Sequence, residues 1–266
     1  MRWDLVAPAV IVASVGAFVL LERIAPYDRQ RLLREGFWTD LVGYTLVQSY
    51  VLAWLIGRLI AALEEGAGAW RPSVLASWPV AAQVAFFVVT HDLYIYWFHR
   101  WQHASPLLWR LHEAHHSVES VDWIAASRSH ALEILVNQTV EFAPMVLLGA
   151  DPRVPLIKGM IGAVWGMWIH ANVGVRTGRL QWIVNGPEAH RWHHAVDLDA
   201  RGHNFATKLA LWDRLFGTAW LPEGRKPSGY GLSDVDYPRT YVGQQVFAFR
   251  PFRGAPPTDG VAVTEA

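Results

Sequence analysis

Five long apolar stretches dominate this sequence, at residues 5–21, 41–63, 78–98, 131–148 and 154–173. Each has about the length that a helix needs to cross roughly 30 Å of hydrocarbon. Several contain polar side chains, and polar groups at membrane depth usually face a protein interior or a functional cavity. The pattern predicts an all-α integral membrane bundle of four to five transmembrane helices. The alternative, a soluble protein with buried helices, has too many such stretches for a soluble core of this size.

The charges between these stretches predict their orientation. Residues 22–37 carry four arginines, whereas residues 64–77 carry only Arg71 and two glutamates. Because connections rich in Lys and Arg stay in the cytoplasm, the first connection is expected to be cytoplasmic. Following the chain from there places residues 99–130 and everything after residue 176 on that side too. We therefore predict a cytoplasmic, helical, histidine-rich cap, most simply at a bacterial inner membrane.

We expect three regions along the chain. Residues 1–75 form N-terminal transmembrane helices, and the first of these is retained because Glu22 and Arg23 follow it without a cleavage pattern. Residues 76–222 form the histidine-containing core with a membrane hairpin. Residues 223–266 are rich in Gly and Pro without a helical period, which predicts an irregular arm and a disordered tail near residues 256–266.

Composition supports a membrane protein and narrows the chemistry. Hydrophobic residues make up 52% of the chain and charged residues 17%, against roughly 25% charged in a typical soluble domain. A net charge of zero gives no indication of a nucleic-acid partner. The absence of Cys excludes disulfides, thiolate nucleophiles and cysteine metal sites. Any metal must therefore be held by His, Asp or Glu, and the chain has twelve His.

Eight of the twelve histidines fall in three short clusters, one with the pattern HxxxH and two with HxxHH. On a helix, residues three and four apart share a face, so in each cluster the imidazoles can point into one space. Eight imidazoles suit two metal ions better than one, and the lack of thiolates argues against a structural zinc site. The predicted ligands are His99, His103, His112, His115, His116, His190, His193 and His194.

The other four histidines lie outside these clusters. His170 and His130 are candidate ligands, with a hydrogen-bonding role as the alternative for each. His203 and His91 are expected to be bystanders, His91 as a buried partner. A ligating histidine usually donates its second ring N–H to a neighbouring group, which fixes the ring. The candidates for such groups, with ordinary ion pairs or helix caps as the alternative, are Asp92, Glu133, Asn172 and Asp213.

The order and spacing of these clusters resemble the fatty acid hydroxylase superfamily, also called the sterol desaturase family. Supporting stretches lie at residues 92–100, 127–133, 170–172 and 211–218, and the resemblance covers roughly residues 20–252. The sequence departs from the family pattern in two places. Ala131 stands where Pro is usual, and residues 204–206 read Asn-Phe-Ala where Asn-Tyr/Phe-Gly is usual. Neither departure touches the eight histidines.

The resemblance implies a non-haem di-iron enzyme that uses O₂ and two electrons to hydroxylate or desaturate a lipid. Such chemistry needs a strongly oxidising metal centre, because an unactivated C–H bond has no acidic proton for general acid–base catalysis. The chain has no dinucleotide fingerprint and no Cys for an iron–sulfur cluster. We therefore expect a separate electron donor, which is a ferredoxin, a cytochrome or a reductase.

Two other functions stay open from the residues alone. A histidine-rich metal transporter or metal-binding membrane protein should place ionisable ligands along a path through the bilayer, whereas here eight gather at one face. A zinc-dependent membrane hydrolase needs fewer ligands, an open coordination position and a nearby carboxylate. The identity of the lipid does not follow from the sequence.

Overall fold

The computed structural model describes residues 2–68, 74–232 and 236–251. Over these ranges the chain is helical, and its β-structure is limited to two isolated bridges. The long helices of the bundle are α1 (Trp3–Ile24), α2 (Ser49–Ala67), α3 (Val80–Ala104), α5 (Ala131–Leu147) and α6 (Arg153–His170). A π-helix, η1 (Thr39–Gln48), leads directly into α2.

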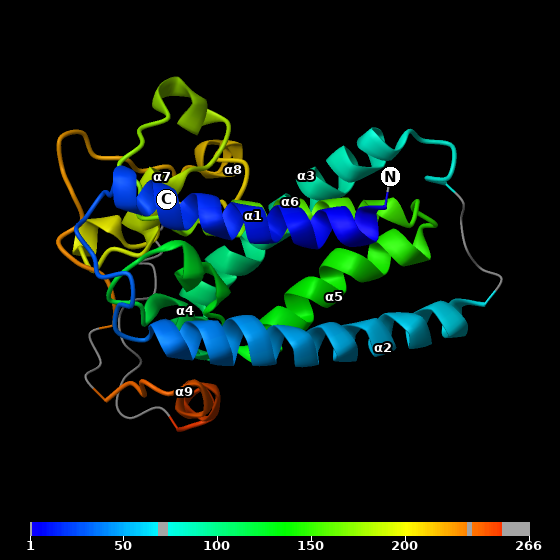
Figure 1. Ribbon diagram of the computed structural model, residues 1–266, viewed down its shortest axis with the longest axis horizontal. Helices are drawn as coiled ribbons and strands as arrows, with labels where there is room; N and C mark the ends of the chain where they lie inside the picture. Colours follow the sequence, from blue (N-terminus) through cyan, green and yellow to red (C-terminus); the bar gives the residue numbers. More distant parts are fainter. Residues whose placement is uncertain (1, 69–73, 233–235, 252–266) are drawn as a thin grey trace.

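Shorter elements form a cap at one end of the bundle, on the left in Figure 1. The long helices run along the horizontal axis of that view, and α3 crosses them at an angle. The cap consists of α4 (Pro106–His116), η2 (Trp123–Ser127), η3 (Gly178–Trp182), α7 (Pro187–His193), η4 (Leu198–Ala200), α8 (Leu211–Leu215) and α9 (Tyr241–Phe247).

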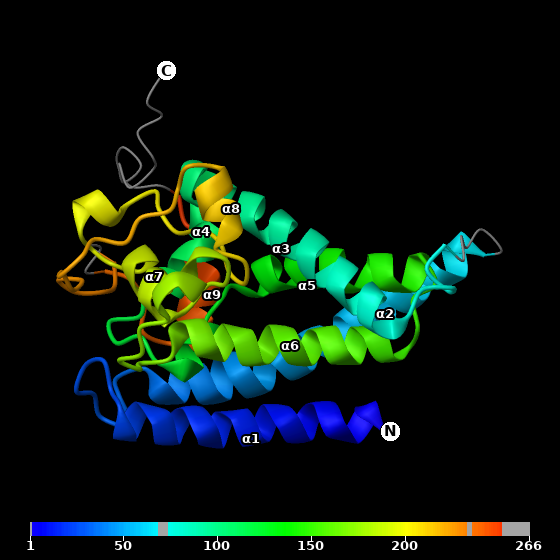
Figure 2. The same cartoon turned by 90° about the horizontal axis from the view of Figure 1, so that it is seen from above.

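The prediction of an all-α membrane bundle is confirmed. Three helices are long and apolar enough to cross a membrane, namely α1, the continuous segment Thr39–Ala67, and α3. The other two predicted spans are also helical, as α5 and α6, but they are only 17 and 18 residues long. α5 runs away from the cap and α6 returns to it, and the two are joined at the opposite end of the bundle (Figure 2).

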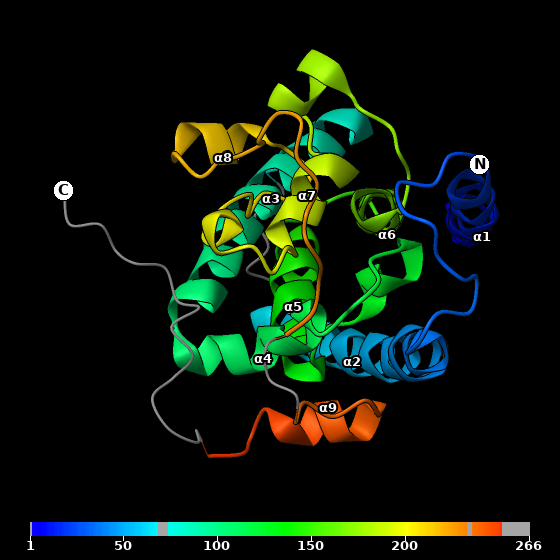
Figure 3. The ribbon, with the colours of Figure 1, turned by 90° about the vertical axis from the view of Figure 1, so that its left-hand side faces the viewer.

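The outer helices α1 and α2 cover one side each of the inner helices α6 and α5. α1 packs along α6, and α2 packs along α5, as the view from the cap end shows (Figure 3). Near the cap, Phe18 of α1 joins Met167 of α6 and Trp123 of η2 in one apolar cluster. At the other end of the bundle, Phe87 of α3 packs with Met145 of α5 in a second cluster. The centre of the bundle is thus closed off from lipid on two sides.

Buried ion pairs connect the start of η1 to the cap. The Arg34 guanidinium donates to both carboxylate oxygens of Asp122, at 3.0 and 2.7 Å, and to Asp40 at 2.7 Å. Arg128 donates to the second oxygen of Asp40 at 2.6 Å. All four side chains are nearly inaccessible to solvent. The chain therefore fixes the cap to the membrane helices with an alternating network of charges.

The C-terminal arm, predicted to be irregular, contains the short helix α9. The hydroxyl of Thr240 caps this helix by accepting the Gly243 N–H at 3.2 Å. The Tyr44 hydroxyl of η1 then donates to the Gln244 side chain at 2.6 Å. Seven residues are too few for a helical period to be visible in the sequence, and contacts with η1 hold this helix. The tail expected at residues 256–266 lies outside the described residues, and the three-region division stays a prediction.

Candidate metal centre

Helix caps bring the first two histidine clusters face to face. The first cluster ends α3, and Ser105 then breaks the helix and caps α4 by accepting the Leu108 N–H at 3.5 Å. Pro106 occupies the first turn of α4, where its missing N–H costs nothing. The chain therefore reverses between the two clusters. The third cluster forms α7, which also starts with a proline, Pro187.

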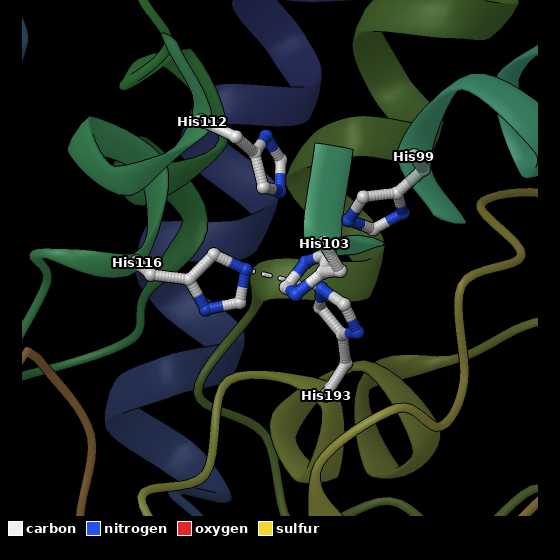
Figure 4. A group of neighbouring side chains, drawn as sticks. All are labelled: His99, His103, His112, His116 and His193. Carbon is white, nitrogen blue, oxygen red and sulfur yellow. Dashed lines mark hydrogen bonds between the residues drawn. The ribbon is translucent and has the colours of Figure 1, made fainter. Parts of the chain in front are cut away.

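Nine histidines assemble into two groups at the junction of bundle and cap. In each group the potential ligand nitrogens all lie within 4.8 Å of one another. The first group, whose rings turn toward a common point in Figure 4, comprises His99, His103, His112, His116 and His193. The second group comprises His115, His170, His190 and His194. The structure thus brings together all eight cluster histidines and adds His170.

Each HxxHH cluster contributes to both groups, which differs from the expectation that its three imidazoles share one space. In α4 the outer pair, His112 and His116, belongs to the first group, and His115 belongs to the second. In the cluster at the end of α7 the assignment is reversed. The outer pair, His190 and His194, belongs to the second group, and His193 belongs to the first. At 3.6 residues per turn, the third and fourth residues after the first lie on opposite sides of it, about 100° apart. One cluster can therefore bind two neighbouring centres.

Hydrogen bonds from the other ring nitrogen aim the imidazoles at these centres. In the second group, Nδ1 of His115 donates to the Arg128 carbonyl at 2.9 Å, and Nδ1 of His170 donates to the Gly166 carbonyl at 2.8 Å. In the first group, His99 donates to the Phe205 carbonyl at 2.8 Å. His193 in turn donates to the His203 carbonyl at 3.0 Å. A carbonyl oxygen only accepts, so each Nε2 keeps an unprotonated lone pair for a metal.

The distances between the facing nitrogens fit metal binding. Nε2 of His190 lies 2.9 Å from Nε2 of His170, and Nε2 of His193 lies 3.1 Å from Nε2 of His116. Nitrogens bound to one ion at about 2.1 Å are separated by about 3.0–3.4 Å. In the first group, Nε2 of His99, His103 and His112 is buried without any hydrogen-bonding partner. Buried polar atoms are rarely left unsatisfied, and a metal ion would satisfy these three.

Electrostatics favours the neutral form of these rings. Burial lowers the pKa of His190, His193 and His194 well below the ordinary value, and neighbouring imidazoles lower it further. The same two causes lower the pKa of His112 and His116. Because a metal binds only the unprotonated imidazole nitrogen, the site is prepared for a metal without prior proton release.

Glu133 is the one predicted carboxylate that contacts a clustered histidine. Its Oε1 accepts from Nδ1 of His112 at 3.1 Å, while Oε2 is buried without a partner. We expect Glu133→Ala to lower metal affinity about 10- to 100-fold, because the ring of His112 is no longer oriented. Glu133→Gln should restore part of this loss, since its amide oxygen can still accept. Metal titration of the two purified variants checks the prediction, and equal affinities for wild type and Glu133→Ala would contradict it.

Asp92 and Asp213 support the histidines indirectly, by holding the backbone of a neighbouring loop. Asp213 accepts the backbone N–H groups of Phe205 and Ala206 at 2.8 and 3.0 Å, and burial raises its pKa to about 6. Asp92 accepts the Lys208 and Leu209 N–H groups at 3.0 and 2.8 Å. The two carboxylates thus hold the loop whose Phe205 carbonyl anchors His99. Neither makes a hydrogen bond to a histidine of the two groups.

Asn172 lies beside the second group without contacting its rings. Its side chain accepts the Asp28 N–H at 3.0 Å and donates to the Asp28 carbonyl at 2.7 Å. Its backbone N–H donates to Glu22 of α1 at 2.9 Å. Asn172 therefore connects the end of α6 to the connection after α1, and it fixes His170 only through the backbone.

His130 belongs to neither group. Its Nδ1 accepts the Leu132 N–H at 3.1 Å as the cap of α5, and its Nε2 donates to the Gln245 carbonyl at 3.0 Å. The adjacent Ala131 N–H donates to the Gln245 side chain at 2.9 Å. Proline, the usual residue here, could not make this bond. The departure at Ala131 thus adds a hydrogen bond to the C-terminal arm.

His203 and His91 lie outside both groups, as expected for bystanders. The ring of His203 stacks on Trp220, with 5.6 Å between centroids, and its carbonyl rather than its ring supports His193. His91 is bonded through Nδ1 to Lys158 at 2.7 Å. At the second departure from the family pattern, Ala206 does not adopt a positive φ, so alanine fits without strain.

The backbone carbonyls that anchor the histidines were missed by reasoning from side-chain types. Those of Phe205 and His203 come from one loop, and Asn204 between them has φ +58°. Asn204 donates to the carbonyls of Ala189 and Trp220, which fixes this loop against α7. The Asn-Phe-Ala stretch at residues 204–206 was the only signal in the sequence.

A cavity of about 340 Å³ leads from the histidines into the bundle between α3, α5 and α6. His99 and His112 of the first group and His115, His170 and His190 of the second line one end of it. Apolar side chains from all three helices line its walls, including Phe98, Ile134 and Trp165. A smaller cavity of about 200 Å³ reaches the first group through the cap loops. The histidines thus meet an interior space that faces the membrane helices.

The sequence profile of the fatty acid hydroxylase family matches residues 84–218, which include all nine grouped histidines. The chain belongs to the fatty acid hydroxylase family. Ornithine lipid hydroxylase OlsE of Rhizobium tropici is 31% identical over 231 residues, covering 84% of this chain and 70% of that protein. Alkylglycerol monooxygenase of Xenopus tropicalis is 31% identical over 187 residues, covering 70% of this chain and 38% of its own length.

A more distant relative of this fatty acid hydroxylase family member is the Delta(7)-sterol 5(6)-desaturase of Leptosphaeria maculans. It is 20% identical over 216 residues, which cover 77% of this chain and 56% of that protein. No solved structure matches the chain. Family membership makes this chain an oxidoreductase, and its nine grouped histidines are where the family's iron-dependent chemistry fits.

Proposed function

We propose that this chain hydroxylates a lipid, using O₂ and two electrons at a centre of two iron ions. The names of the relatives describe hydroxylation or monooxygenation of lipids, and membership of the family indicates the same class of reaction. The division of the nine histidines into two groups supports two ions rather than one. The first ion would be held by five imidazoles and the second by four.

One contact carries the proposal of a metal in the second group. Nε2 of His115 lies 3.3 Å from Nε2 of His170. Both rings donate through Nδ1 to backbone carbonyls, so both Nε2 atoms bear lone pairs. Two lone pairs at this distance repel each other, and they cannot share a hydrogen bond. A cation between them removes the repulsion, and imidazole nitrogen is a good ligand for iron.

The chain's own residues have three tasks in this reaction. Bound iron would supply the oxidising power to break an unactivated C–H bond. The histidines hold their positions through the carbonyl contacts described above, and Glu133 orients His112. The cavity between α3, α5 and α6 would place the lipid next to both groups, against apolar side chains such as Phe98, Ile134 and Trp165. Orientation of the reacting carbon is then the protein's main contribution to rate.

The proposal also covers the orientation of the protein in the membrane and its source of electrons. We propose that the cap faces the cytoplasm of a bacterial inner membrane, on the basis of the arginines in residues 22–37. A separate ferredoxin, cytochrome or reductase would supply the electrons. The cavity of about 200 Å³ at His103 and His193 opens through cap loops that include Arg201.

Iron analysis and a labelling experiment test the proposed function. The purified protein should contain about two irons per chain, with a Mössbauer spectrum of two high-spin sites. Supplied with reductase, ferredoxin, NADPH and isotopically heavy O₂, it should transfer one heavy oxygen atom to a lipid of a bacterial membrane extract. A single zinc per chain without O₂ consumption would overturn the proposal and favour a hydrolase.

A further inference from the structure

A charged cluster lies within the bundle, on the cavity wall remote from the metal centre. It consists of His91 on α3, Glu141 on α5 and Lys158 on α6. The Lys158 ammonium forms an ion pair with Glu141 and donates to Nδ1 of His91 at 2.7 Å. Lys158 is fully buried behind the other two residues, whereas Glu141 and His91 line the cavity.

The cluster and the metal centre share one cavity. Glu141 follows Glu133 by eight residues on α5, and His91 precedes His99 by eight residues on α3. At 1.5 Å per residue, each interval spans about 12 Å. Beyond the cluster, the apolar side chains of Phe87 and Met145 close that end of the bundle. A lipid that enters the cavity therefore meets the metal centre and the charged cluster about 12 Å apart.

Packing alone does not account for these charges. Replacing a buried ion pair by apolar side chains is often neutral or stabilising, and ionisable groups at membrane depth commonly mark functional sites. Two further polar side chains, Asn137 and Gln138, line the cavity on the same helix as Glu141. The polar lining of the cavity thus extends along α5 beyond the ion pair itself.

The helix opposite Glu141 leaves space beside the carboxylate. Gly159, Gly162, Ala163 and Gly166 of α6 line the cavity at helical spacing. A Cβ atom built on Gly162 would lie 3.9 Å from Oε1 of Glu141 and close to no other atom outside its own helix. A small group of a ligand can therefore reach this carboxylate without displacing the backbone.

The charges at this end of the cavity balance. Lys158 pairs with Glu141, and Lys208, which also lines the cavity, lies 3.8 Å from Asp92. A cationic ligand group would leave a net charge in the membrane, which is costly. An uncharged donor can bond to Glu141 without this cost, because a hydrogen bond to a charged acceptor is among the stronger ones.

We propose that Glu141 accepts a hydrogen bond from an uncharged hydroxyl group of the lipid substrate, at a subsite about 12 Å from the carbon that is oxidised. The proposal rests on the proposed function and specifies its substrate class, a hydroxyl-bearing lipid. Lys158 pairs with Glu141, and the glycines of α6 leave the subsite open. The subsite selects the lipid, while the histidines determine where it is oxidised.

Paired lipid probes test the subsite by binding rather than by turnover. The probes are hexadecylglycerol, which has free hydroxyls, and its dimethyl ether, which has none. Binding to the iron-loaded protein in detergent micelles is measured by equilibrium dialysis. The wild type should bind hexadecylglycerol at least about tenfold more tightly, which corresponds to the strength of one hydrogen bond to a charged group.

The double variant Glu141→Leu/Lys158→Met removes the ion pair without leaving a lone charge. We expect its preference for free hydroxyls to fall to less than about twofold, with iron content and thermal stability retained. Val140→Ala, on the lipid-exposed side of the same helix, is the matched control and should keep the full preference. A double variant that keeps the tenfold preference would overturn the proposal.

Gly162→Leu gives an independent test, since it fills the subsite from the opposite helix. It should weaken hexadecylglycerol binding at least about tenfold while leaving iron content unchanged. Gly57→Leu on α2, where nothing lies within 4 Å, is its control. Equal binding of both probes to the wild type, or binding of neither, also overturns the subsite. If the iron-loaded protein instead transfers no oxygen to a lipid, the proposed function fails, and the binding preference remains measurable.

Discussion

Replacement of His115 by alanine is expected to abolish turnover and to lower bound iron from about two ions to about one. His115 is one of only four imidazoles in the second group, and its Nε2 faces that of His170 at 3.3 Å. Loss of a group that merely orients a ligand typically costs 10- to 100-fold in affinity or activity. Loss of the ligand itself should exceed that range. Iron content and hydroxylation of a membrane lipid extract are the measurements.

His203→Ala is the matched control for this variant. The ring of His203 stacks on Trp220 outside both groups, and the carbonyl that supports His193 survives the substitution. We expect measurable turnover and two bound irons. Complete loss of activity together with loss of metal in His203→Ala would show that His203 is a ligand, and it would contradict the assignment of nine histidines.

Arg34→Met is expected to lower the free energy of unfolding by about 3–5 kcal/mol, because removal of one partner leaves a buried charge unpaired. Arg34 bonds Asp122 through two nitrogens and Asp40 through one, and its side chain is 4% exposed. Asp122 would lose its arginine, although the Ala125 N–H still donates to it. Denaturation in mixed micelles, followed by circular dichroism, measures the change.

The exposed pair of Arg2 and Asp4 supplies the control. Its nitrogen–oxygen distance of 2.6 Å is as short as that of the buried pairs, but both side chains are more than half exposed. Water screens such a pair, so Arg2→Met should leave unfolding unchanged within error. If Arg34→Met behaves like Arg2→Met, the buried network does not fix the cap to the membrane helices.

Local periodicity explains why the helices and the convergence of eight histidines were predictable. Apolar stretches of membrane length specify helices wherever they occur, and five such stretches are helical here. A spacing of three or four residues places imidazoles on one side of a helix whatever the surroundings. His170 was harder to assign, because a lone histidine at a helix end carries no spacing pattern.

Carboxylates were a poor guide to the groups that orient the rings. Of the four predicted side chains, Glu133 alone contacts a clustered histidine, while Asp92 and Asp213 hold a loop. Most anchors are backbone carbonyls, which every residue possesses and which residue type therefore cannot mark. The approach of the Phe205 carbonyl to His99 joins residues 106 positions apart.

The sequence by itself determined the all-helical membrane fold, the clustering of eight histidines and the absence of thiolate ligands for any metal. Only the tertiary structure decided how the histidines divide, since α4 and α7 each supply both groups from different sides of one helix. It also decided that His170 joins them and that His130 caps α5 instead. The reason is physical: spacing fixes which side chains share a helix face, but packing between helices fixes where that face points.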